Sequence, residues 1–256
     1  NWVRKETGIS EGERHPLTWI MEAAEDIAYS VLDIEDAMHK GIISPDDVRE
    51  ILAHRLGENY KDFKNYLRKK FAEVRRKDLS IREAREVMCA YIRTKSIETL
   101  ICEAIEDYRN DKKYIFSYQR LTPLMHDSEL LKSLKYIAKE YVFTDPDVRK
   151  IEADGFKIVA GLMDFYWYSI KNRKERSDLT SRRIDAKSAY GQSKISNNYI
   201  NIVNRSKYVG RNKRQLPVRY KELRLLTDMV SGMSDGFAKN EYKYLKANEI
   251  LPICPT

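Results

Sequence analysis

The chain has 256 residues, 42% hydrophobic and 34% charged, with only 10 Gly and 7 Pro. This composition predicts a folded, helix-rich protein. It contains no run of 18 apolar residues and no secretory signal, so we expect a cytoplasmic protein without a membrane span. Scattered cysteines argue against a disulfide framework or zinc site: Cys89, Cys102 and Cys254. The net charge of +8 favours a polyanionic partner, and a first residue of Asn rather than Met indicates a fragment or a processed chain.

The first long predicted helix runs from His15 to Gly41, with Pro16 suited to its first turn and Gly41 to its end. At about 100° per residue, one apolar stripe should face a core: Ile20, Ala24, Ile27, Val31, Ile34 and Met38. The opposite face carries carboxylates and a phenol: Glu22, Glu25, Asp26, Tyr29, Asp33 and Asp36. This face is either a solvated surface or a wall that binds a divalent metal and a substrate hydroxyl.

Further helices are predicted along the first half of the chain. Ser44 and Ser80 are expected to cap helices over 45–56 and 81–108, and residues 58–77 should also be helical. Residues 112–124 are expected to be irregular, with a short strand at YIFSY, and residues 128–142 to be helical.

The second half begins with a predicted helix after Thr144. Gly155 either ends this helix or allows a close contact with another helix. A buried helix is predicted to follow over 156–170. The polar, basic and serine-rich stretch 171–198 is expected to be a mobile loop. One last helix should run from about Val218 to Lys246. Together these elements predict an all-α multi-helix bundle. We divide it into a first region over 1–170 and a basic loop and helical region over 171–256. The two regions are expected to form one continuous domain.

Three segments, in order, resemble one family. HPLTWIMEAAEDIAYSVLDIED, beginning at His15, is similar to the EAADDI-x-Y-x3-D helix of the bacterial deoxyguanosine triphosphate triphosphohydrolases (dGTPases), which are HD-domain phosphohydrolases. YVFTDPDVRKIEADG over 141–155 and RLLTDMVSGMSDGFAKNEY over 224–242 also agree. The resemblance covers nearly the whole chain, most loosely over 172–219, where a deletion is indicated, and it implies the C-terminal part of the HD-domain fold.

The resemblance implies an activity: a divalent Mg or Mn ion assists water in converting dGTP to deoxyguanosine and tripolyphosphate. The family holds the metal with one His, a His-Asp pair and a distant Asp. The last position falls on Glu25, with Asp26 next to it, and either carboxylate is a candidate ligand. The His and His-Asp ligands are missing, so the chain is expected to be inactive without the N-terminal half.

Other site residues are also carried over from the family. Tyr29 and Asp33 match residues that meet the deoxyribose of dGTP or another dNTP, with Asp33 accepting from the 3′-hydroxyl. In a homo-oligomer, Phe143 and Glu152 match a guanine pocket reached across subunits, although core packing and a surface ion pair are the simpler interpretations. The family also sends basic residues into a neighbouring site from the region of Arg176 and Lys187.

The chain's histidines do not fill the missing ligand positions. His15 opens a helix, and His39 and His54 have no metal spacing to each other. His126 and Asp127 form an HD dipeptide, but they follow the Asp-bearing helix, whereas the family's pair precedes it. We therefore interpret them as polar turn residues.

A second hypothesis is a non-catalytic protein that binds single-stranded nucleic acid. Basic residues cluster over 68–77, 171–183 and 205–224, and the last segment interleaves them with tyrosines. Such a pattern can follow a nucleic-acid backbone and stack its bases. Single-stranded DNA binding is also a property of the bacterial dGTPases that the chain resembles. The simpler interpretation of these segments is a solvated face.

Overall fold

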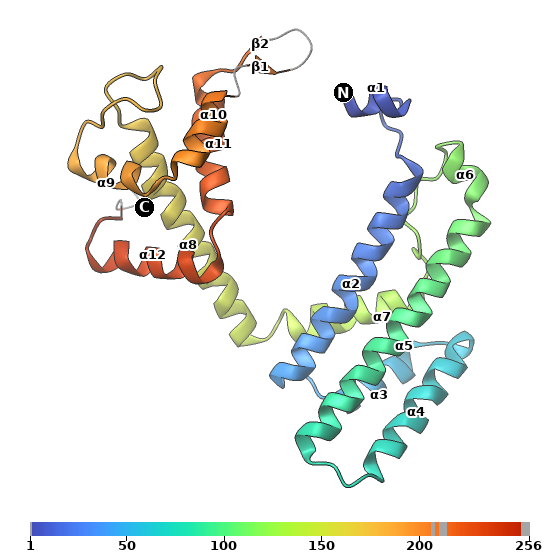
Figure 1. Cartoon of the computed structure of the whole chain (residues 1–256). Coiled ribbons are helices and arrows are strands. Elements are labelled where there is room, and N and C mark those ends of the chain that lie inside the picture. The colour runs from blue at the N-terminus through green and yellow to red at the C-terminus, as the bar shows by residue number, and fades with distance from the viewer. Residues whose placement is uncertain (1, 206–207, 210–213, 252–256) are drawn as a thin grey trace. The chain divides into compact units, whose positions relative to one another are not determined.

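A computed structural model describes residues 2–205, 208–209 and 214–251, and it is all-helical apart from one small ribbon (Figure 1). The ribbon pairs β1 (Tyr208–Val209) with β2 (Arg214–Gln215) in antiparallel register. The predicted all-α class is confirmed. The chain divides into two compact units, residues 1–149 and 150–256. No helix in the described ranges is long and apolar enough to cross a membrane.

Unit 1 is a helical bundle whose elements are joined by turns and, over 8–15 and 117–128, by longer irregular segments. These elements are α1 (Trp2–Thr7), α2 (Pro16–Lys40), α3 (Pro45–Arg55), η1 (Glu58–Tyr60), α4 (Lys61–Arg75), α5 (Ile81–Asn110), α6 (Lys112–Phe116), α7 (Glu129–Ile137) and η2 (Ala138–Val142). Helices α2 and α5 pack along each other and form the centre of the unit (Figure 1). The core consists of fully buried side chains, among them Trp19, Ile34, Met38, Phe71, Ile92 and Leu100.

The predicted helix ends in unit 1 are confirmed by their capping contacts. Gly41 follows α2 in the left-handed conformation, with φ 78°, which glycine adopts without a Cβ clash. Ser44 and Ser80 each begin a helix as one half of a reciprocal capping box. Because these signals are local, the sequence was sufficient to place them.

Two predictions for unit 1 are wrong. The YIFSY segment contains no strand, because α6 continues the helical path immediately after α5 and buries Ile115 completely. Ile20 and Ala24 do not face the core, since Ile20 remains 45% exposed and Ala24 is exposed as well. The residues that turn inward instead are Trp19 and Ala23, one position earlier in the sequence.

Unit 2 is a smaller helical assembly, and the boundary between the units falls within its first helix. Its elements are α8 (Pro146–Lys171), α9 (Ala186–Lys194), α10 (Asn197–Arg205), the β1–β2 ribbon, α11 (Val218–Ser231) and α12 (Asp235–Ala247). Its core gathers buried side chains from these helices: Leu162, Phe165, Tyr166, Ile170, Val203, Leu225 and Leu245.

The structure corrects three predictions for the second half. Gly155 neither ends a helix nor makes a close contact, because α8 continues through it and a Cβ there would meet nothing within 4 Å. The segment 156–170 is buried only along one side, with Phe156 77% exposed. The expected helix from Val218 to Lys246 is broken after Ser231, and the Ser234 hydroxyl accepts from the Phe237 amide to begin α12.

Candidate functional site

The acidic face of α2 lies on the surface of unit 1. Glu25 and Asp36 are exposed, Tyr29 is 62% exposed, and Asp33 is half-buried. Because Glu25, Tyr29 and Asp33 are spaced four residues apart on one helix, their side chains project from the same face. The row spans roughly 12 Å at 1.5 Å per residue, which is sufficient for one nucleotide to contact all of its members.

Cations from other elements bind part of this face. Arg14, in the segment before α2, pairs with Glu22. The Nζ atom of Lys135, in α7, lies 2.8 Å from Oδ1 of Asp26. No described Lys or Arg forms an ion pair with Glu25. Of the two candidate metal ligands, Asp26 is therefore held by a cation while Glu25 is open to solvent.

Asp33 has an unusual environment for a surface carboxylate. Partial burial raises its pKa above the ordinary value of 3.8, and the negative charge of Asp36 raises it further. Within the described ranges, no group donates a hydrogen bond to Asp33. Both effects destabilise the ionised form of Asp33. A ligand hydroxyl that donates a hydrogen bond to this carboxylate would therefore offset the free energy lost by its partial burial.

The residues present do not by themselves fit a metal ion. No group of three His, Cys, Asp or Glu side chains in the described part of the chain is arranged to hold one. Nδ1 of His15 accepts from the Leu17 amide at the start of α2, and His39 lies 3.6 Å from the Glu35 carboxylate. Glu25 alone offers too few oxygens for Mg²⁺ or Mn²⁺, which need near-octahedral coordination.

The His126-Asp127 dipeptide lies in the exposed turn before α7. Asp127 pairs with Lys132 at 3.4 Å. Both residues of the dipeptide line an acidic cavity of about 400 Å³, together with Glu103, Asp107 and the buried Arg120, among others. His126 and Asp127 lie in a turn, as the sequence predicts, and they also form part of the wall of this cavity.

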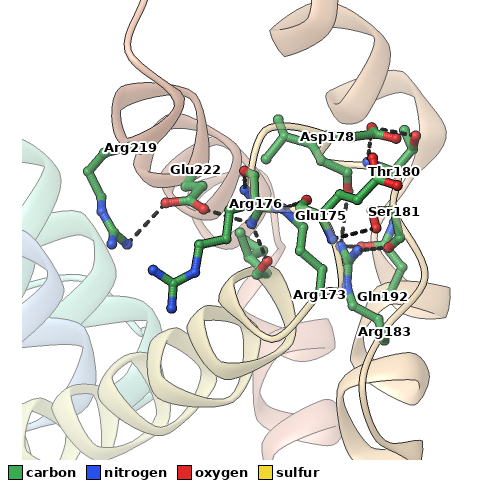
Figure 2. Close-up of polar contacts among 12 residues, drawn as sticks. Arg173, Glu175, Arg176, Asp178, Thr180, Ser181, Arg183, Gln192, Arg219 and Glu222 are labelled. Carbon is green, nitrogen blue, oxygen red and sulfur yellow. Dashed lines mark hydrogen bonds and ion pairs between the residues drawn. The ribbon is translucent and has the colours of Figure 1, made fainter.

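In unit 2, two buried arginines organise the segment between α8 and α9. The loop predicted over 171–198 is wrong where α9 and the start of α10 take its place. Figure 2 shows Arg173 and Arg183 inside the turn between α8 and α9. Arg173 donates to the carbonyls of Ile170 (2.7 Å), Glu175 (3.2 Å) and Arg176. Arg183 donates to the carbonyls of Ser181 (2.5 Å) and Leu179 (3.1 Å), and to the Gln192 side chain.

Among the described residues, only one of the two buried guanidinium groups has a carboxylate partner. Glu222, in α11, accepts from Arg173 at 2.6 Å and from the more exposed Arg219 at 3.0 Å (Figure 2). Arg183 forms no ion pair with any described carboxylate, and its Nε atom is buried without a hydrogen-bond partner. Burial lowers the pKa of Arg183, and the charge of Arg173 lowers it further. No sequence signal marked these buried arginines, because burial of a basic side chain depends on tertiary carbonyl acceptors.

The turn leaves other cationic side chains at the surface. Lys174, Arg176 and Arg182 are exposed. Lys187, in α9, is half-buried, with Nζ 5.3 Å from the centre of the Tyr168 ring. The candidate residues Arg176 and Lys187 therefore belong to one ordered basic segment of unit 2.

Comparison with known proteins places these features in a family context. The chain is 32% identical over 267 residues to the deoxyguanosinetriphosphate triphosphohydrolase of Salmonella arizonae, covering 96% of this chain and 51% of that protein. The enzymes of the same name from Enterobacter sp. strain 638 and Klebsiella pneumoniae are each 30% identical over 260 residues, with the same coverage. This chain is homologous to part of the bacterial dGTPases. It spans about half the length of the curated relatives it matches, and no protein-family model matches it.

Homology to the dGTPases confirms the resemblance drawn from the sequence, while the individual site residues stay predictions. Phe143 lies in unit 1 directly after η2 and is 46% exposed. Glu152 lies in the part of α8 that belongs to unit 2 and is exposed. Both side chains are accessible enough to meet a ligand or a second subunit.

Proposed function

We propose that this chain forms part of a dGTPase active site, in which α2 binds the nucleoside portion of dGTP. In the reaction, water attacks the α-phosphorus and the bond to the 5′-oxygen breaks, giving deoxyguanosine and tripolyphosphate. The observation that carries the proposal is the row formed by the exposed Glu25 and Tyr29 and the half-buried Asp33, on a chain homologous to dGTPases.

The row divides the recognition of the nucleotide among its members. Asp33 accepts from the sugar 3′-hydroxyl, which would relieve its lack of a hydrogen-bond donor. Tyr29 presents an exposed ring on which the deoxyribose packs. Glu25 faces the phosphates and is a better candidate metal ligand than Asp26, because Asp26 is paired with Lys135. A divalent Mg or Mn ion would polarise the phosphate when bound.

The metal needs further ligands, because Glu25 alone does not hold it. We infer that they come from the half of the dGTPase fold that this chain does not span, which the resemblance of its motifs implies to be the N-terminal half. The chain alone should therefore bind nucleotide weakly and hydrolyse it poorly. Phe143, Glu152, Arg176 and Lys187 would complete neighbouring sites in a homo-oligomer, where guanine and phosphates are contacted across subunits.

The test is thermal unfolding of the chain with dGTP and Mn²⁺. A ligand present at 100 times its Kd stabilises the native state by about 2.7 kcal/mol, so Tm should rise. The rise should be lost in Asp33→Ala and kept in Asp36→Ala, a carboxylate on the same helix outside the row. Dideoxy-GTP, which lacks the 3′-hydroxyl, should raise Tm less. An equal rise in Asp33→Ala and wild type would contradict the role of Asp33.

A second candidate function is the binding of single-stranded nucleic acid by unit 2. Residues 150–256 contain 21 Lys and Arg against 11 Asp and Glu, a net charge of +10. The exposed cations of the turn between α8 and α9 are available to phosphates. Fluorescence anisotropy with a labelled oligo-dT tests this function directly, and binding unaffected by salt would contradict it.

A further inference from the structure

Unit 1 has an apolar groove of about 440 Å³ between α2 and α5. Its walls come from side chains four residues apart on each helix: Ile20, Ala24 and Ala28 on α2, and Ile97, Ile101 and Ile105 on α5. Ile20, Ile101 and Ile105 are 45%, 44% and 46% exposed. Helix α2 thus has a second apolar face outside the core of its own unit, which is unusual for the surface of a completed domain.

The groove has the form of a helix-binding surface. Isoleucines form a ridge on α5, while alanines on α2 keep the opposite wall low, so a third helix can approach closely. Arg109 is the only charged side chain among the described residues that line it. An occupant helix would therefore present large apolar residues at every third or fourth position.

We propose that this groove receives an apolar helix from the half of the dGTPase fold that the chain does not span, whether that half lies on the same polypeptide or on another. The inference rests on the proposed function and names the surface at which the two halves of the site join. The match supports the inference because it covers only 51% of the length of the Salmonella arizonae relative. In a common fold, the half that this chain does not span must pack on some surface of the half that it does. The groove also adjoins the acidic face on α2.

A second copy of this chain fits the groove less well. Glu25 lies about 60° around α2 from Ala28 at 100° per residue. Two-fold pairing of α2 with its own copy would therefore bring carboxylates of like charge together, at an energetic cost. A helix that differs from α2 in sequence avoids this repulsion and still covers the isoleucines.

The experiment co-expresses the full chain, carrying an affinity tag, with the part of the Salmonella arizonae dGTPase that lies outside the region of homology. We expect the two to purify together in a 1:1 complex without nucleotide. Ile101→Asp should weaken the association roughly 100-fold or more, because it buries a carboxylate without a partner. Ile81→Asp is the matched control, since Ile81 lies in the same helix and is 91% exposed outside the groove. Circular dichroism should show both variants folded.

Each result has a defined meaning. A complex lost in Ile101→Asp and kept in Ile81→Asp supports the proposal. Absence of a wild-type complex, equal association of the two variants, or a homodimer dispersed by Ile101→Asp overturns it. Asp33→Ala separates this inference from the proposed function, because it should leave association intact while removing the response to dGTP. A complex without any nucleotide response in the wild type would reject the proposed function and leave the groove assignment standing.

Discussion

The two units of the chain use charge in opposite ways. Unit 1 is nearly neutral, with 26 Lys and Arg against 28 Asp and Glu, and the acidic face of α2 lies on its surface. Unit 2 has a net charge of +10 and buries Arg173 and Arg183 among main-chain carbonyls. The overall charge of +8 hides this difference. In unit 1 charge is available for ligands, whereas in unit 2 part of the charge maintains the fold.

Removing Glu222 is the strongest test of this structural use of charge in unit 2. Glu222→Ala leaves the Arg173 guanidinium, whose side chain is 0% exposed, without its carboxylate. Loss of one partner of a buried pair costs about 3–5 kcal/mol, which denaturant unfolding can measure. The control in unit 1 is Glu86→Ala, where the Glu86–Arg82 pair is exposed and the expected change is within about 0.5 kcal/mol. Equal effects of the two variants would remove the contrast between the units.

Arg183→Met should have a smaller effect than loss of Glu222. Arg183 has no described carboxylate partner, so its removal leaves no buried countercharge behind. The substitution deletes hydrogen bonds to two carbonyls and to Gln192 while relieving repulsion with Arg173. We expect a loss of about 1–3 kcal/mol in unfolding free energy. A loss as large as that of Glu222→Ala would show that Arg183 has an anionic partner.

The surface cations of unit 2 should matter for binding rather than for stability. If this unit binds single-stranded DNA, Arg176→Ala combined with Arg182→Ala should weaken oligo-dT binding roughly tenfold. The slope of the logarithm of the binding constant against the logarithm of the salt concentration should also become shallower, by about 0.7 for each phosphate that is no longer neutralised. Anisotropy titrations at several salt concentrations measure both quantities. Arg82→Ala is the control, because Arg82 is a highly exposed arginine in unit 1. A similar weakening in Arg82→Ala would indicate unspecific attraction to the whole chain.

The sequence was informative where the structure depends on residues that are close together along the chain. Pro16, Gly41, Ser44 and Ser80 mark helix ends through local hydrogen bonds and backbone preferences, and the structure confirms all of them. The break at Gly232 to Ser234 was missed although it also has a local cap, because apolar periodicity continues on both sides and favoured one long helix.

Other features depended on contacts that a sequence pattern does not contain. Ile20 and Ala24 were correctly seen as apolar, but helical periodicity could not distinguish the core from a groove on another side of the helix. The acidic face of α2 was predicted as a whole, while the pairing of Asp26 with Lys135 joins positions distant in the sequence. The burial of Arg173 and Arg183 was missed, because it depends on main-chain carbonyl acceptors that no side-chain pattern reveals.

Asp33→Asn tests the use of charge in unit 1, with the smallest expected effect. An acid whose pKa is raised by folding contributes stability below its unfolded value, near 3.8, and that contribution is lost as the pH rises through the raised value. At pH 7 the ionised Asp33 therefore costs stability, and Asn, which stays neutral, should raise the free energy of unfolding by about 0.5 kcal/mol after discounting for solvent screening. The gain should disappear below about pH 4. Thermal unfolding at both pH values, with and without dGTP, should show a more stable protein with a weaker nucleotide response, because the Asn side-chain oxygen still accepts from a hydroxyl but lacks the carboxylate charge. Destabilisation at pH 7 would mean that Asp33 supports the fold.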